Sequence, residues 1–180
     1  MTSQGDILYL GTEDNAKFVF RTKSDGSRKE KVLSLPVLHL ISTSPDGQWV
    51  IVWIADKTKQ AATSVMAYPV AGGNPVLICT GCIGGAGPAR DSTPIARWSP
   101  DGAFFYFALK AWRNTWAVPV HPAGSLPSLP ASGIESEADV ARMPGARRLS
   151  NTNVSPSPKL PSYAFTRVVA QRNLYRIRIP

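Results

Sequence analysis

Residues 41–55 read Ile41-Ser-Thr-Ser-Pro-Asp-Gly-Gln-Trp-Val-Ile-Val-Trp-Ile-Ala55, a tight turn in front of a run of apolar side chains. The same arrangement returns 55 residues later in Ala96-Arg-Trp-Ser-Pro-Asp-Gly-Ala-Phe-Phe-Tyr-Phe-Ala-Leu109. In Ser-Pro-Asp-Gly, the proline sets φ for the second turn position, and the glycine adopts a conformation that a Cβ would hinder. The motif therefore predicts a tight turn between two strands in both places.

The strands that follow the two turns are apolar on both faces. A strand with one face in water alternates polar and apolar side chains, but residues 49–54 and 104–109 are apolar at every position. We therefore predict that Gln48 to Ala55 and Ala103 to Lys110 are central strands with other elements packed on both sides.

The motif belongs to a longer internal repeat. After each buried strand comes a second strand that ends in a glycine turn, and then a short outer strand. These segments are Val65–Gly73 and Pro75–Ile78 in the first copy, and Trp116–Gly124 and Ala146–Leu149 in the second. A degenerate third copy starts at Ser155-Pro-Ser-Pro158 and continues in Tyr163–Thr166 and Leu174–Ile179. The N-terminal unit has lost its leading strand and turn, and keeps a buried strand, its partner and an outer strand at Ile7–Leu10, Phe18–Gly26 and Glu30–Leu33.

A four-stranded antiparallel meander that repeats along the chain is the plan of a β-propeller blade. The sequence thus predicts an all-β fold, a partial β-propeller of three-plus blades that forms a single domain over residues 1–180. The blade units cover roughly residues 4–40, 41–88, 91–150 and 151–180. We interpret an insertion at residues 122–145 as a solvated loop, with a recognition loop as the alternative. Ser136 and Asp139 predict the capped start of a short helix within it.

These repeats resemble the WD40-like PD40 repeats of bacterial TolB-type propellers, and they are similar to the propellers that precede the catalytic domain of prolyl-oligopeptidase-like enzymes. The segments Tyr163–Arg167 and Gln171–Ile177 also resemble the C-terminal part of propellers attached to bacterial signalling proteins, such as serine/threonine kinases and winged-helix regulators. The resemblance implies a non-catalytic scaffold or sensory module for protein or ligand binding, as the C-terminal part of a larger bacterial signalling protein. The alternative that it implies is the propeller portion of a serine peptidase whose hydrolase domain lies elsewhere.

Cys79-Thr-Gly-Cys82 has the spacing of a redox pair or of half a zinc site. The chain contains only these two cysteines, and its only histidines, His39 and His121, fall in other units at turn-like positions. We favour a pair of inert or opportunistically oxidised thiols, with a disulfide and a metal site as the alternatives. We expect no metal and no cofactor.

No other motif in the sequence indicates catalysis. A Gly-x-Ser-x-Gly nucleophile motif is missing, and the turns explain both Asp46 and Asp101. Gly81 to Gly87 is glycine-rich but lacks the Lys-Ser/Thr of a phosphate-binding loop, which favours an inter-blade loop. The sequence therefore predicts no enzyme and no catalytic residues, and it assigns no binding residues.

The chain carries 20 Lys and Arg against 12 Asp and Glu, a net charge of +8, which favours anionic partners. Nucleic acid is nevertheless not the partner that we predict, because the basic residues fall on expected solvated edges. These are Arg167, Arg172, Arg176 and Arg178 near the C-terminus, and Lys23, Arg28, Lys29 and Lys31 near the N-terminus. With no signal peptide and no apolar run of ~18 residues, we expect a soluble chain, cytoplasmic as written or periplasmic within a longer membrane-tethered protein.

The number of strands predicts an open wedge, because closed propellers have ~4 to 8 blades. Its end faces would expose apolar side chains such as Leu8, Leu10, Tyr175, Ile177 and Ile179. We therefore expect the chain to be the C-terminal piece of a longer protein, or to self-associate through its open blade faces.

Overall fold

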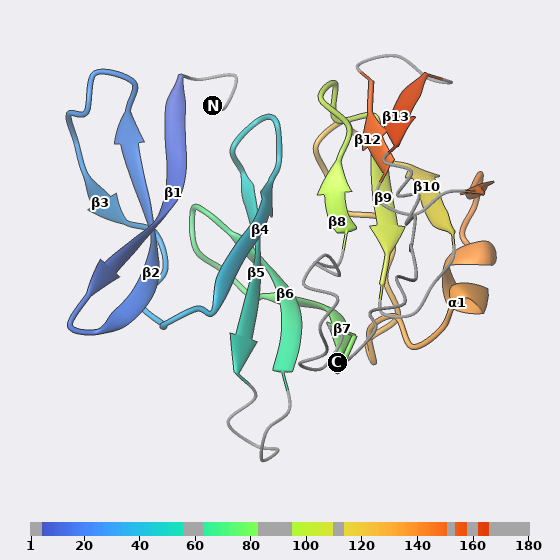
Figure 1. Ribbon diagram of the computed structural model, residues 1–180, viewed down its shortest axis with the longest axis horizontal. Coiled ribbons are helices and arrows are strands. Elements are labelled where there is room, and N and C mark those ends of the chain that lie inside the picture. The colour runs from blue at the N-terminus through green and yellow to red at the C-terminus, as the bar shows by residue number, and fades with distance from the viewer. Residues whose placement is uncertain are drawn as a thin grey trace, which may run out of the picture.

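A computed structural model describes residues 5–55, 63–82, 95–109, 114–150, 154–157 and 162–165. Almost all the regular structure is β, in antiparallel sheets that follow one another in chain order (Figure 1). The first blade, on the left of Figure 1, has the strand order β1-β2-β3, and the second blade beside it has the order β4-β5-β6-β7. The third blade, on the right, has the order β8-β9-β10-β11, and a fourth unit pairs β12 with β13.

The bounds of the strands follow the predicted repeat in the first three units, but β12 covers Ser155 and Pro156, which we predicted to lie in a turn. The first blade contains β1 (Asp6–Glu13), β2 (Ala16–Lys23) and β3 (Glu30–Lys31). The second contains β4 (His39–Thr43), β5 (Trp49–Ala55), β6 (Thr63–Pro69) and β7 (Val76–Thr80). The third contains β8 (Ile95–Trp98), β9 (Phe104–Ala108), β10 (Thr115–Pro119) and β11 (Arg147–Leu149), with helix α1 (Glu137–Ala141) before β11. The last unit contains β12 (Val154–Pro156) and β13 (Tyr163–Phe165).

These sheets form an open row of blades, and the described strands do not close into a ring (Figure 1). Two complete four-stranded meanders side by side, with a three-stranded unit before them, confirm the prediction of an all-β partial β-propeller. The segment Leu174–Ile179 and the arginines from Arg167 onward lie outside the described residues.

Both Ser-Pro-Asp-Gly motifs form the same tight turn. Gly47 has a φ of 74°, and its N–H donates to the Ser44 carbonyl at 2.9 Å. The Asp46 carboxylate accepts hydrogen bonds from the Ser44 hydroxyl at 2.5 Å and from the Gln48 N–H at 3.0 Å. The second turn repeats these contacts with Ser99, Asp101, Gly102 and Ala103 in the same positions. Both aspartates therefore serve their turns, as the sequence predicts.

The two central strands separate three apolar clusters. In β5, Ile51 packs towards the third blade with Phe105 and Phe107, whereas Val50 and Val52 pack with side chains of the first blade. In β9, Tyr106 lies in a third cluster on the face away from the second blade. Both faces of β5 and of β9 are thus covered, which confirms the prediction for the residues of these strands that the structure describes.

Two strands that we predicted to be buried are more exposed. In β1, Ile7 is 37% exposed, whereas Leu8 and Leu10, which we expected on an exposed end face, are half-buried in the cluster with Val50 and Val52 of the second blade. In β13, Phe165 is 50% exposed. Both strands lie in units at the ends of the row, and among the described residues β1 has no strand on one of its edges. Burial at these positions depends on a neighbouring element that the pattern of the strand itself cannot report.

The insertion between β10 and β11 is part of the core, and our interpretation of a solvated loop was wrong. Ile134 and Val140 are 2% and 0% exposed and belong to the cluster between the second and third blades. The Ile134 N–H donates to the carbonyl of Ile78 in β7 at 2.6 Å. The sequence conceals this apolar content because Ile134 and Val140 stand singly among polar, charged and turn-forming residues, without the alternation of a strand.

Helix α1 starts at the predicted cap. The Asp139 carboxylate accepts hydrogen bonds from the backbone N–H groups of Ser136 at 2.8 Å and Glu135 at 3.0 Å. These bonds stabilise the charged carboxylate and hold the pKa of Asp139 below its ordinary value of 3.8.

Tyr106 carries a buried hydroxyl that makes no hydrogen bond within the part of the chain that the structure describes. Burial raises the pKa of Tyr106 above its ordinary value of 10.0, and the Asp101 carboxylate adds to the shift while Arg97 opposes it. Because the pKa of Tyr106 is higher in the folded than in the unfolded protein, folding favours the neutral phenol. The stability of the folded state is therefore unaffected by this group below the unfolded value of 10.0, and it falls as the pH rises through the folded pKa.

We expect Tyr106→Phe to leave the free energy of unfolding unchanged near neutral pH, or to raise it by up to about 1 kcal/mol, because no hydrogen bond is lost. Above the ordinary tyrosine pKa, the variant should lose less stability than the parent, although Tyr68, whose pKa burial also raises, still titrates. Urea unfolding at about pH 7 and about pH 11 measures both effects. A clear destabilisation of the variant at neutral pH would show that the hydroxyl has a partner.

Candidate functional site

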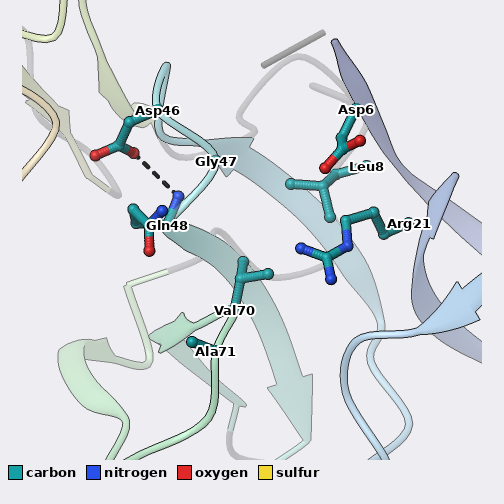
Figure 2. A pocket seen from close by; sticks show the side chains of 8 residues that line it. All are labelled: Asp6, Leu8, Arg21, Asp46, Gly47, Gln48, Val70 and Ala71. Atoms are coloured by element: carbon teal, nitrogen blue, oxygen red, sulfur yellow. Dashed lines mark hydrogen bonds between the residues drawn. The ribbon is translucent and has the colours of Figure 1, made fainter. Parts of the chain in front are cut away.

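A polar cavity of about 180 Å³ opens between the first and second blades (Figure 2). Asp6, Leu8 and Arg21 line it from the first blade, and the Asp46–Gln48 turn and the Val70–Ala71 segment face them from the second (Figure 2). A second cavity of about 240 Å³ shares Asp6 and Arg21 with the first. Its other lining residues are Thr22, Lys23, Arg28 and Glu30. All the lining residues of the second cavity belong to the first blade, and we call the two adjoining cavities together the inter-blade groove.

Pairing between β1 and β2 positions the charged groups of the groove. Asp6 lies opposite Lys23 and Leu8 lies opposite Arg21, so these four side chains share the face towards the second blade. Lys23 Nζ lies 2.6 Å from Asp6 Oδ1, and the Asp6 side chain is only 9% exposed. Arg21 forms an ion pair with Glu30, with Nε donating to Oε1 at 2.6 Å. Each charge is thus held in place by a partner of opposite sign.

The next interface along the chain shows what apolar residues do at the same positions. Trp49 pairs with Pro69 at the start of β5 as Asp6 pairs with Lys23 at the start of β1, so Trp49 is the equivalent of Asp6. In the same register Ile51 is the equivalent of Leu8, and Ala67 is the equivalent of Arg21. Trp49, Ile51 and Ala67 all pack in the apolar cluster between the second and third blades.

Asp6 and Arg21 therefore replace a tryptophan and an alanine of the repeat, and a polar cavity lies where the other interface is packed with apolar side chains. The turn that faces them also differs, because Gln48 stands where the next turn has Ala103. Packing of blades does not require these polar groups, since the neighbouring interface has none of them. Concave sites with a few convergent polar groups are typical of ligand binding.

Our sequence reasoning missed this groove, although a signal was present. Aligning the N-terminal unit with the second unit places Asp6 and Arg21 at positions where an inter-blade face is otherwise apolar. The repeat by itself reveals the strands, and only a comparison of its equivalent positions reveals which of them have changed from apolar to charged.

Cys79 and Cys82 form a disulfide, which was an alternative to the inert or opportunistically oxidised thiols that we favoured. Their Cα atoms are 5.8 Å apart, within the range that a disulfide spans. Both residues are buried beside the core cluster between the second and third blades. The spacing alone could not decide, because disulfide, free and metal-bound pairs share it.

We expect reduction of this disulfide to lower the free energy of unfolding by about 2 kcal/mol, because closing so short a loop removes little entropy from the unfolded chain. Urea unfolding with and without a phosphine reductant measures the change. The double variant Cys79→Ala/Cys82→Ala should not respond to the reductant. Alkylation of both cysteines by iodoacetamide in denatured, unreduced protein would contradict the assignment.

The other sequence candidates do not assemble into a chemical centre in the part of the chain that the structure describes. His39 begins β4 and is not in the turn that we expected, and His121 precedes a cis peptide bond at Pro122. Among the described residues, no three His, Cys, Asp or Glu side chains gather where they could hold a metal ion. Most of the glycine-rich segment from Gly81 to Gly87 lies outside the described residues.

The N-terminal lysines cover aromatic rings on the outer face of the first blade. Lys29 Nζ lies 4.6 Å from the ring centroid of Phe20, and Lys31 Nζ lies 4.0 Å from that of Phe18. Lys31 also pairs with Glu13 at 2.6 Å. Both lysines are exposed, in agreement with the predicted solvated edge. None of the helices that the structure describes is long and apolar enough to cross a membrane.

The fold defines the class of protein, a partial β-propeller. No protein-family model matches the chain, and no curated protein matches it. Among solved structures, it is similar to TolB from Acinetobacter baumannii, with 17% identity and a TM-score of 0.46 over 67% of this chain and 28% of that one. It is similar also to a protein assigned as TolB from Agrobacterium tumefaciens, with 17% identity and a TM-score of 0.46 over 86% of this chain and 47% of that one. The chain thus spans less than half the length of either TolB chain.

Proposed function

We propose that this chain is a non-catalytic β-propeller module that binds a polar ligand or a protein segment in the inter-blade groove. The observation that carries the proposal is the replacement of Trp49 and Ala67 of the repeat by Asp6 and Arg21 at the interface of the first two blades. Following the resemblance of its repeats, we further propose that the module belongs to a larger bacterial signalling protein.

The charges of the groove indicate the chemistry of its ligand. Its acidic residues are Asp6, Glu30 and Asp46, and its basic residues are Arg21, Lys23 and Arg28. Acids and bases balance, so the groove offers both donors and acceptors and favours a zwitterionic or mixed-charge group over a polyanion. Such a balance also supports a partner other than nucleic acid, whose binding depends on neutralising many phosphates.

A photo-crosslinking amino acid at Gln48, an exposed residue of the groove, tests the proposal in cells that express the intact protein. The same amino acid at Ala103, the equivalent position of the next turn, is the matched control. We expect a defined adduct from position 48 that disappears when Arg21→Gln is added, and no such adduct from position 103. Equal adducts from both positions, or adducts that survive Arg21→Gln, would contradict the proposed site.

A second measurement tests the non-catalytic part of the proposal. A fluorophosphonate probe labels activated serine nucleophiles. We expect it to leave the intact protein unlabelled. Stoichiometric labelling would instead favour the propeller of a serine peptidase.

A further inference from the structure

The second cavity of the inter-blade groove carries more positive than negative charge. Acids and bases balance over the groove as a whole, but the residues that line the second cavity include three bases and only two acids. The bases are Arg21, Lys23 and Arg28, and the acids are Asp6 and Glu30. This cavity therefore has one surplus positive charge.

Arg28 is the base that has no acidic partner. Lys23 pairs with Asp6 at 2.6 Å. Arg21 contacts Glu30 through Nε and Nη2, both at the oxygen Oε1, and its Nη1 has no contact with a described residue. Arg28 makes no ion pair or hydrogen bond within the part of the chain that the structure describes. The cavity thus offers a free guanidinium and a further free donor.

The remaining acid of the groove, Asp46, does not neutralise Arg28. Its Oδ1 accepts two hydrogen bonds within its own turn. Its Oδ2 lies against Gly124, where a Cβ would be 2.7 Å away. Figure 2 shows the carboxylate directed away from Asp6 and Arg21. The surplus positive charge therefore remains available to a ligand.

The backbone of Arg28 is strained for an arginine. Its φ of 53° lies in the left-handed region, where a Cβ is unfavourable. Asp14 and Asn15 are the other two non-glycine residues with positive φ in the described part of the chain, and their short polar side chains suit that conformation. Glycine would form the turn at position 28 with less strain, so the turn itself does not require an arginine. Such an outlier beside a cavity indicates a functional side chain.

The residue before Arg28 is fixed by three hydrogen bonds. The Ser27 N–H donates to Oδ1 of Asp25 at 2.8 Å. The Ser27 carbonyl accepts from the Lys23 N–H at 2.9 Å and from the Thr22 hydroxyl at 2.8 Å. Arg28 therefore starts from a defined point of the chain, which reduces the entropy lost when its side chain binds a ligand.

We propose that Arg28 and Nη1 of Arg21 bind a carboxylate group of the ligand in the second cavity. One surplus positive charge matches a singly charged carboxylate better than a phosphate monoester, which carries up to about two negative charges. Guanidinium groups also present the planar arrangement of donors that a carboxylate accepts. The rest of the ligand extends into the first cavity, towards Gln48. The carboxylate site rests on the proposed function, to which it adds the chemical class of the ligand.

Titration of the full chain with N-acetylglycine, a small carboxylate, tests this site without the natural ligand. We expect saturable shifts of the backbone NMR signals of Arg21 and Arg28. The uncharged N-acetylglycinamide should cause none, and inorganic phosphate at the same ionic strength should bind more weakly. No saturable shift with N-acetylglycine, equal binding of the amide, or tighter binding of phosphate would overturn the assignment.

Two variants test the role of Arg28 itself. Arg28→Gly removes the guanidinium and suits the positive φ, so the variant should be at least as stable as the parent. We expect it to bind N-acetylglycine about tenfold or more weakly. Lys29→Gln removes the same charge one residue later, where the lysine covers Phe20 on the other face of the blade, and should leave binding unchanged. Equal affinities of the two variants would overturn the role of Arg28.

The photo-crosslinked adduct from position 48 separates this site from the proposed function. An adduct that Arg21→Gln removes and Arg28→Gly leaves at full yield would support ligand binding in the groove and overturn the role of Arg28. The absence of an adduct, together with N-acetylglycine binding that depends on Arg28, would contradict the proposed function and support the carboxylate site. Loss of the adduct in both variants supports the two together.

Discussion

Replacement of Phe105 by alanine is expected to lower the free energy of unfolding by about 3–5 kcal/mol. Phe105 is the second residue of β9 and is 0% exposed. Its ring lies 4.9 Å from that of Trp98 in an edge-to-face arrangement and 4.7 Å from that of Phe107. All three belong to the cluster that joins the second and third blades, so the truncation leaves a cavity at the interface on which the row of blades depends.

Urea unfolding followed by tryptophan fluorescence measures this loss, with Phe165→Ala as the matched control. Phe165 is 50% exposed in β13, and its truncation should change stability by no more than about 0.5 kcal/mol. Since domains have only about 5–15 kcal/mol of stability, Phe105→Ala is expected to leave the protein close to unfolding. A similar small effect for both variants would mean that the cluster between the blades does not hold the fold together.

The sequence could predict the blades because their signals are local. The turn at Ser44–Gly47 and the apolar run that follows it depend on residues within one hairpin, and the two hydrogen bonds to Asp46 form inside that turn. The internal repeat then extends this local evidence to the second hairpin at Ser99–Gly102. Both turns and both central strands have the predicted structure.

The remaining features depend on residues that are distant in the sequence. The groove combines Asp6 and Arg21 with a turn some 40 residues further on, and Ile134 of the insertion reaches β7, more than 50 residues earlier. The exposure of β1 depends on what lies beside it. Neither periodicity nor composition reports such contacts, but comparison of equivalent positions in the repeat could have located the two charges.

Gly102→Ala is expected to lower the free energy of unfolding by about 3 kcal/mol, because both the backbone conformation and the space around this position exclude a side chain. Its φ of +72° lies in the left-handed region, where any Cβ is strained by roughly 1–2 kcal/mol. A Cβ at Gly102 would in addition lie 2.7 Å from the backbone nitrogen of Gly124, which donates a hydrogen bond to the Gly102 carbonyl at 2.8 Å. Backbone cannot rotate out of the way as the end of a side chain can, so the turn after β10 would have to move.

Gly26→Ala separates the two requirements. Gly26 has a similar φ of +82°, but a Cβ there meets no atom within 4 Å, so this variant should lose only the roughly 1–2 kcal/mol of backbone strain. The backbone of Gly124 lies so close to the second blade that a Cβ built on it would be 2.7 Å from Oδ2 of Asp46. A displacement of Gly124 should therefore also move the Asp46 turn. We therefore expect Gly102→Ala, and not Gly26→Ala, to shift the backbone NMR signal of Gln48, whose N–H donates to the Asp46 carboxylate. Equal losses of stability for the two variants, with no shift at Gln48, would mean that the turns of neighbouring blades are not mechanically coupled.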